Sequence, residues 1–207
     1  MTAPPLERLL AGFRAFRARY FEQRPELFER LAARGQNPEV LVIGCSDSRA
    51  DPAILLGTEP GELFVIRNVA NLVPPYEPDG HYHGTSSAVE FAVRDLAVKH
   101  IVVLGHSGCG GIQALVASGE GKLKGREFIA GWVSLVAKAV PAGAHRDRTQ
   151  EMEQAAIRVS LENLLTFPWL RDRVNDGSLT LHGWWFDLEG GKLWGIDDPK
   201  AEFRTLS

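Results

Sequence analysis

The sequence contains few cysteines and lacks any apolar run long enough to cross a bilayer. Only Cys45 and Cys109 occur among 207 residues, too few for a disulfide framework and compatible with a reducing compartment. Residues 1–23 interrupt their apolar positions with charge every few residues, so they contain neither a signal-peptide core nor a membrane span. We therefore expect a cytoplasmic protein with no membrane partner.

An excess of one charge is absent as well. The 23 Lys and Arg residues nearly balance 26 Asp and Glu residues, and no long basic run occurs, so we expect no nucleic-acid partner. Repeats and low-complexity tracts are also lacking. A chain of 207 residues can bury a sizeable core, which predicts one domain over residues 1–207, with a helical arm at 1–35 and a core at 36–207.

The arm has apolar residues at mostly three- and four-residue steps between positions 6 and 34, as in amphipathic helices. Pro25 restarts this pattern and Gly35 ends it, which predicts two helical pieces. The exposed stripe of such an arm would be unfavourable in an isolated monomer.

The core alternates β-rich and helical segments. Short continuous apolar runs, typical of strands buried on both faces of a parallel sheet, occupy residues 40–43, 63–66 and 101–104. Helices are predicted at 84–99, from about 109, and at about 126–139 and 149–165, and a last strand at 179–184 turns at Gly190-Gly191 into 192–194. The fold class is therefore α/β, with a central, mostly parallel β-sheet flanked by helices and an N-terminal helical arm.

Three residues with metal-binding side chains follow two of the predicted strands. Cys45 ends the first strand, and His106 and Cys109 follow the third. If these strands are neighbours, the three side chains converge at the carboxyl edge of the sheet, where α/β proteins bind ligands. Two cysteines and one histidine match the ligand set of catalytic zinc, which keeps a fourth position open.

Two charged residues lie close to the first cysteine. Two thiolates weaken zinc as a Lewis acid, so a water ligand needs help to ionise. The Asp47 carboxylate can accept a hydrogen bond from this water ligand. The Arg49 guanidinium can keep that carboxylate ionised and oriented. Taken singly, each of these residues is better explained as a buried thiol, a turn residue or a surface charge; their combination favours a site.

These residues resemble a known family. Cys-Ser-Asp-Ser-Arg at 45–49 with His-Ser-Gly-Cys-Gly at 106–110 is similar to the β-class carbonic anhydrases, and the likeness includes 61–73 and covers about 30–190. The resemblance implies reversible hydration of carbon dioxide to bicarbonate and a proton by attack of zinc-bound hydroxide. It assigns one Zn²⁺ per chain to Cys45, His106 and Cys109, and Asp47 and Arg49 to a catalytic dyad.

The resemblance also implies a substrate pocket and an assembly. Gln36 matches an amide that binds bicarbonate, Phe64 and Phe91 match apolar walls for carbon dioxide, and the Gly110 amide matches a donor to substrate oxygen. Members assemble as homodimers or homotetramers, with the active site at a dimer interface.

Some members close the zinc site with the dyad aspartate and bind regulatory bicarbonate through tryptophan, arginine and tyrosine. Here Val42 and Phe186 occupy the tryptophan and tyrosine positions, and only Arg67 remains. We therefore predict the open, plant-like type, with little cooperative inhibition by bicarbonate.

Four other functions remain alternatives. The same metal chemistry would suit hydrolysis of carbon disulfide or carbonyl sulfide, and a non-catalytic zinc protein could sense bicarbonate or metal. A phosphate-binding turn at 105–111 lacks both glycine-rich nucleotide motifs, and a redox dithiol lacks a C-x-x-C spacing. His81, His83, His100, His145 and His182 receive no role.

Overall fold

The computed structural model describes residues 4–118, 123, 125–139 and 149–207, so His145 lies outside the described residues. The chain divides into two compact units, Met1–Asn37 and Pro38–Ser207. In the first unit, α1 (Pro5–Arg17) continues through the π-helical η1 (Ala18–Gln23), and α2 (Pro25–Arg34) follows. The break at Pro25 is as predicted. Gly35 then ends α2 with φ 74°, a backbone conformation that favours glycine.

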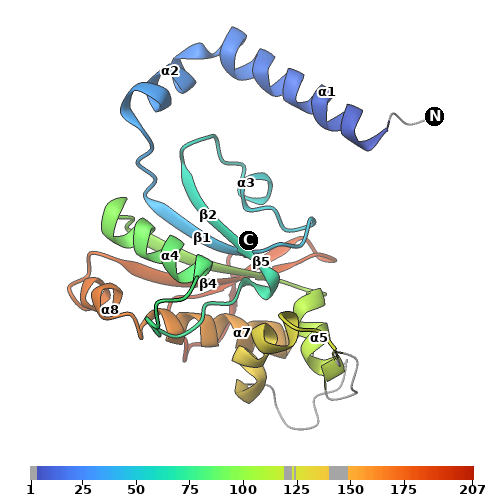
Figure 1. The fold of residues 1–207 in the computed structure, drawn as a ribbon, viewed down its shortest axis with the longest axis vertical. Coiled ribbons are helices and arrows are strands. Elements are labelled where there is room, and N and C mark those ends of the chain that lie inside the picture. The colour runs from blue at the N-terminus through green and yellow to red at the C-terminus, as the bar shows by residue number, and fades with distance from the viewer. Residues whose placement is uncertain (1–3, 119–122, 124, 140–148) are drawn as a thin grey trace. The chain divides into compact units, whose positions relative to one another are not determined.

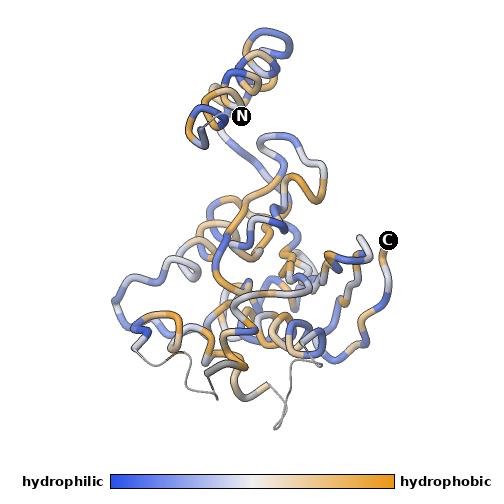
Figure 2. Tube along the Cα trace, turned by 90° about the vertical axis from the view of Figure 1, so that its right-hand side faces the viewer, coloured by the Kyte–Doolittle hydropathy of each residue, from blue (hydrophilic) through white to orange (hydrophobic). Residues whose placement is uncertain are grey.

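Aromatic side chains hold the first unit together. The Phe28 ring lies 5.5 Å from that of Phe16 and 4.8 Å from that of Phe21, measured between ring centroids. Leu6 and Leu9 on α1 are 73% and 69% exposed, so part of the apolar stripe has no cover within the unit. Figure 2 shows hydrophobic and hydrophilic residues alternating along these helices, as the predicted amphipathic pattern requires.

A six-stranded sheet forms the second unit (Figure 1). The strand order is β2-β1-β3-β4-β5-β6; the first four strands are parallel, and the last two join antiparallel. The strand bounds are β1 Val40–Cys45, β2 Leu63–Asn68, β3 His100–His106, β4 Thr180–Asp187, β5 Lys192–Ile196 and β6 Arg204–Thr205. The predicted strands and the hairpin after β4 are therefore confirmed.

The main core lies between one face of the sheet and several helices. Alternate strand residues such as Leu41, Ile101 and Leu181 pack against Ile157 and other residues of the long helix α7. The helices of this unit are α3 Pro52–Leu55, α4 Gly84–Glu90, α5 Gly110–Ser118, α6 Ile129–Val133, α7 Thr149–Leu164 and α8 Pro168–Asn175. The opposite face buries Val42, Val102 and Leu104.

Some predicted elements differ in detail. The helix expected at 84–99 ends earlier: α4 passes into the π-helical η3 (Phe91–Asp95), and Ala97 adopts φ 53°, which a continuing helix does not allow. The segment expected at 126–139 consists of α6 and the 3₁₀-helical η4 (Ser134–Ala139). Helices α3 and α8 and strand β6 were not predicted. Within the described ranges, no helix is both long and apolar enough to cross a bilayer.

The strand register brings the ends of β1, β2 and β3 together. Gly44 pairs with Leu104 on one side, and Cys45 pairs with Asn68 on the other. The short helix η2 (Val69–Asn71) follows β2 directly and lies at the same edge of the sheet. The carboxyl edge of the parallel strands therefore contains the residues for which a metal site was predicted.

Candidate metal centre

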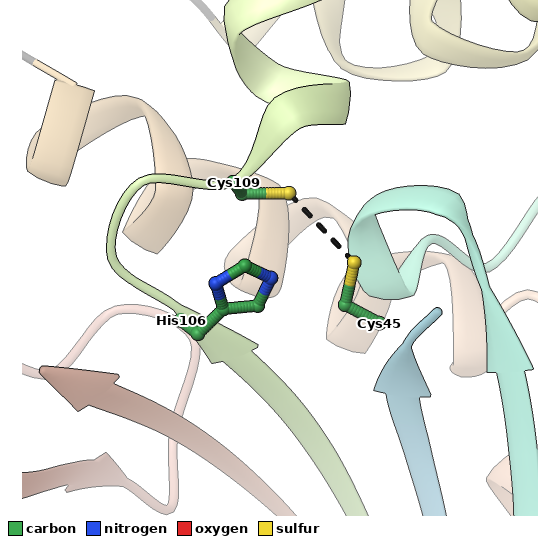
Figure 3. A group of neighbouring side chains, drawn as sticks. All are labelled: Cys45, His106 and Cys109. Carbon is green, nitrogen blue, oxygen red and sulfur yellow. Dashed lines mark hydrogen bonds between the residues drawn. The ribbon is translucent and has the colours of Figure 1, made fainter. Parts of the chain in front are cut away.

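Three elements position the predicted metal ligands. Cys45 is the last residue of β1, His106 is the last residue of β3, and Cys109 immediately precedes α5 (Figure 3). All three side chains are buried, and their ligand atoms lie within 4.8 Å of one another. Residues 64 positions apart in the sequence thus meet because β1 and β3 are adjacent and parallel.

The geometry of this cluster fits a tetrahedral ion. The two sulfur atoms are 3.9 Å apart, and two Zn–S bonds of about 2.3 Å at a tetrahedral angle require about 3.8 Å. His106 Nδ1 lies 2.9 Å from the carbonyl of Ser107, which only accepts, so Nδ1 carries the proton and Nε2 has a free lone pair. Nε2 is buried and has no hydrogen-bond partner in the described part of the chain. A zinc ion would satisfy that atom.

The two thiols influence each other's protonation. Hydrogen bonding from Cys109 lowers the pKa of Cys45, and contacts with His106 and two backbone amides lower it further against the effect of burial. The pKa of Cys109 is raised by its hydrogen bond to Cys45 and by burial. The metal-free pair therefore favours one thiolate, which already provides the anionic ligand that a metal requires.

A strained turn supports Cys45. The amides of Asp47 and Ala70 each point at Cys45 Sγ from 3.4 Å. Ala70 is fully buried and adopts φ 66°, a conformation that costs a non-glycine residue free energy. Gly111 packs so closely against this turn that a Cβ there would approach Val69 Cγ1 to 2.7 Å. The start of α5 thus keeps the turn against the sulfur.

The predicted dyad is formed. Arg49 donates from Nε to Asp47 Oδ1 at 2.9 Å and from Nη2 to Asp47 Oδ2 at 2.7 Å, a bidentate pair. The guanidinium and the Arg49 amide hold the pKa of Asp47 well below its usual range. Asp47 Oδ2 lies 3.8 Å from His106 Nε2, so the carboxylate borders the cluster while Arg49 holds it in place.

Arg67 fixes the loop that carries the dyad. Its guanidinium donates to the carbonyl oxygens of Cys45 at 3.0 Å and Asp47 at 2.7 Å, and it forms an ion pair with Asp51. Asp51 in turn caps α3, accepting from the amides of Ala53 and Ile54. Each of the three guanidinium nitrogens of Arg67 thus has an acceptor within the protein.

Glu153 is a residue of this site that the sequence analysis missed. This α7 carboxylate is only 3% exposed, accepts the Cys109 amide at 3.0 Å and accepts Trp185 Nε1 at 3.1 Å. Burial raises the pKa of Glu153, and those two donors oppose that shift. The sequence did contain a signal for a buried acid here. Glu153 lies at helical spacing from Ile157 and Ser160, which are also buried, so it falls on the apolar face of its helix.

The predicted apolar wall lies away from the metal cluster of the same chain. Phe64 and Phe91 do meet, with ring centroids 5.8 Å apart. However, Phe64 lies four residues before Asn68, the strand partner of Cys45, which corresponds to about 13 Å along β2. Gly110 is exposed at the first position of α5, and Gln36 is exposed in the first unit.

The fold and site together define an α/β protein with a Cys₂His zinc site at the carboxyl edge of a parallel sheet. Residues 40–193 match the family model described as carbonic anhydrase. The chain is 43% identical over 183 residues to "Beta carbonic anhydrase 5, chloroplastic" of Arabidopsis thaliana, covering 85% of this chain and 60% of that protein. It is 36% identical to Arabidopsis "Beta carbonic anhydrase 3", covering 98% and 81% of the two chains.

Solved structures agree with these relatives. The β-carbonic anhydrase CcaA superposes with a TM-score of 0.85 at 33% identity, over 98% of this chain and 92% of that one. A tetrameric β-carbonic anhydrase from Sordaria macrospora superposes with a TM-score of 0.78 at 30% identity, covering 92% and 96%. This chain belongs to the β class of the carbonic anhydrase family.

Proposed function

We propose that this protein catalyses the reversible hydration of carbon dioxide to bicarbonate and a proton. The observation that carries the proposal is the buried, unpartnered His106 Nε2 beside two thiols, with the Arg49-held Asp47 carboxylate at its border. The names of the relatives support the same activity.

The metal ligands, Asp47 and Arg49 have separate roles in the proposed reaction. A zinc ion held by Cys45, His106 and Cys109 would lower the pKa of a water ligand, so that a nucleophile is available near neutral pH. Asp47 would accept a hydrogen bond from that nucleophile and so direct its lone pair towards the substrate. Arg49 keeps Asp47 ionised and, by holding both of its oxygens, away from the metal position. This arrangement supports the open type of site.

The substrate pocket is proposed to form between two copies of the chain. The strand register separates Phe64 from Cys45 of the same chain, so the apolar wall at each metal would come from the partner's Phe64 and the partner's Phe91. Phe91 is 45% exposed, and Ile54, Val65 and Phe128 are exposed as well, which is unfavourable in an isolated chain. A homodimer, or a tetramer of two dimers, would cover such residues. Gln36 and the Gly110 amide keep their predicted roles as hydrogen-bond donors to bicarbonate.

Stopped-flow carbon dioxide hydration with metal analysis tests the proposed function. We expect about one zinc per chain and hydration that disappears on chelation and returns with Zn²⁺. Zinc without hydration would contradict the proposal and favour the sensor, or the hydrolase of carbon disulfide or carbonyl sulfide, which the same sample can be assayed for.

Subunit mixing tests the shared pocket. Cys45→Ser removes a metal ligand and Phe64→Asp removes the apolar wall, so each variant alone should be inactive. If the wall comes from the partner, a mixed dimer contains one intact site, and unfolding and refolding the two variants together should restore about a quarter of wild-type hydration.

The control mixes Cys45→Ser with a Cys45→Ser/Phe64→Asp double variant, which contains no intact site in any pairing. Wild-type chains should regain activity after the same treatment. If they do and neither mixture recovers hydration, the apolar wall belongs to the same chain as the metal, which would contradict the shared pocket.

Bicarbonate should inhibit this protein without cooperativity. Two of the three positions that bind regulatory bicarbonate in other members hold Val42 and Phe186 here, and Val42 is fully buried in the sheet. The third, Arg67, is already bound to Cys45, Asp47 and Asp51, so a bicarbonate ion would have to compete with these groups for it. Inhibition measured against bicarbonate concentration should give a Hill coefficient of about 1. A coefficient near 2, or a crystal at neutral pH with Asp47 on zinc, would refute the open type.

Replacing Glu153 should weaken zinc binding, because this residue supports the backbone of the ligand Cys109. Glu153→Ala leaves the buried Cys109 amide and the Trp185 indole without an acceptor, at a cost of about 1–3 kcal/mol for each group. We expect a lower melting temperature and about 10-fold to 100-fold weaker zinc retention in a chelator competition assay. Glu153→Gln keeps one acceptor oxygen, which can serve the Cys109 amide but not the Trp185 indole as well, so it should recover part of the zinc affinity. Equal loss in both variants would contradict the positioning role.

A further inference from the structure

A second group of metal-binding side chains lies at the opposite edge of the sheet. His100 is the first residue of β3 and His106 the last, so about 20 Å of strand separates this group from the Cys₂His centre. His100 pairs in register with Thr180 on β4, and His182 follows two residues later on the same face of that strand. Parallel pairing of β3 and β4 therefore brings two imidazoles and a hydroxyl together.

The polar atoms of this group converge. His100 Nδ1 lies 2.6 Å from Thr180 Oγ1, which lies 3.0 Å from His182 Nε2. The two ring nitrogens are themselves 3.5 Å apart. Two Zn–N bonds of about 2.0–2.1 Å at a tetrahedral angle require about 3.3–3.4 Å between the nitrogens. The pair is thus spaced as two ligands of one ion.

A carboxylate orients one of the imidazoles. His182 Nδ1 lies 2.7 Å from Asp197 Oδ1, and Arg204 Nη2 lies 3.1 Å from the other oxygen of Asp197. A carboxylate only accepts, so His182 Nδ1 carries the proton and Nε2 presents its lone pair to His100 and Thr180. This carboxylate–histidine arrangement is the support that metal-ligating histidines usually have.

We propose that His100 Nδ1 and His182 Nε2 form a second metal site, for a divalent ion that prefers imidazole, such as Zn²⁺ or Cu²⁺. Thr180 Oγ1 lies near both nitrogens, and water would complete the coordination of the ion. Without metal, the Thr180 hydroxyl donates to His182 and accepts from His100, which satisfies the same atoms. Binding requires that His100 move its proton from Nδ1 to Nε2 and that the Thr180 hydroxyl turn its hydrogen away from His182 Nε2, towards an acceptor such as the Lys99 carbonyl. The ion ties β3 to β4, and through Asp197 to the β5–β6 segment.

Zn²⁺ titration of the zinc-loaded protein, followed by calorimetry, tests the site. We expect a second equivalent to bind the wild type, and His100→Asn and His182→Asn each to abolish that binding. Asp197→Asn should weaken it about 10-fold, because the amide cannot orient His182 as the carboxylate does. In excess Zn²⁺ the melting temperature of the wild type should rise, and that of His182→Asn should not.

A matched control comes from the other exposed histidines. His81 and His83 both contact Asp79, so a His81→Ala/His83→Ala variant removes an alternative surface site and should keep the second equivalent. Loss of the second equivalent in this control but not in His100→Asn/His182→Asn, or no second equivalent in the wild type, would overturn the proposal. Retention of the first zinc by each variant shows that it folds, and the readout is independent of hydration activity.

Discussion

Replacement of His106 by alanine should remove the zinc ion and reduce carbon dioxide hydration at least about 10³-fold. His106 provides the nitrogen of the ligand cluster, and among the described residues its Nε2 and the Asn71 Nδ2 are the buried side-chain atoms without a hydrogen-bond partner. The remaining thiols supply two ligands, one fewer than a catalytic zinc site uses. Without the ion, the pKa of water stays at about 15.7 instead of about 7, so the nucleophile is lost at neutral pH.

Metal analysis and stopped-flow hydration measure this effect together. His81→Ala is the matched control, because its imidazole is 84% exposed and lies in a loop outside the cluster. Circular dichroism checks that His106→Ala folds, since the substitution opens a cavity at a fully buried position. A folded variant with full zinc content and wild-type hydration would refute the assignment of His106 as a ligand.

Replacement of Asp47 by asparagine should reduce hydration about 10²-fold to 10⁴-fold and leave zinc content unchanged. The amide keeps the shape of the side chain but presents one acceptor oxygen in place of two, so it cannot both pair with Arg49 and accept from the nucleophile. Zinc should remain, because Asp47 is outside the ligand set.

The pH profile separates this role from a general loss of structure. Arg49 holds the pKa of Asp47 below its usual value, so the carboxylate stays ionised above about pH 4, and its contribution is lost only as the pH falls further. Wild-type activity between pH 5 and 9 should therefore report another ionisation. Asp79→Asn is the control, since His83 and the His81 amide lower the pKa of Asp79 to about 2 in an exposed loop. Loss of zinc in Asp47→Asn would contradict the proposed role.

Strands β1 and β3 were predicted from sequence because each is a continuous β-rich run buried on both faces. Strand β2 was expected to be buried in the same way, but it lies at the edge of the sheet and only Ile66 in it is buried. Two shorter helices, α3 and α8, were not predicted from the sequence, for physical reasons. Helix α3 has four residues and no periodicity to detect, whereas α8 mixes Arg171 and Asp172 with only a few apolar positions. Pro168 at the start of α8 was the available signal.

The sequence by itself determined the metal ligands and the dyad. Cys45, Asp47 and Arg49 lie within five residues, and His106 and Cys109 within four, so local spacing after a strand was sufficient to predict their chemistry. Bidentate pairing of residues 47 and 49 is likewise a local interaction.

Only the tertiary structure decided which distant residues surround that centre. Glu153 reaches the Cys109 amide from α7, and Arg67 holds the β1 loop from β2, contacts that depend on helix placement and strand register. The same register separates Phe64 from Cys45 and brings His100 to His182 at the other edge. A sequence specifies which side chains have reactive groups, but the pairing of strands decides which of them lie within bonding distance.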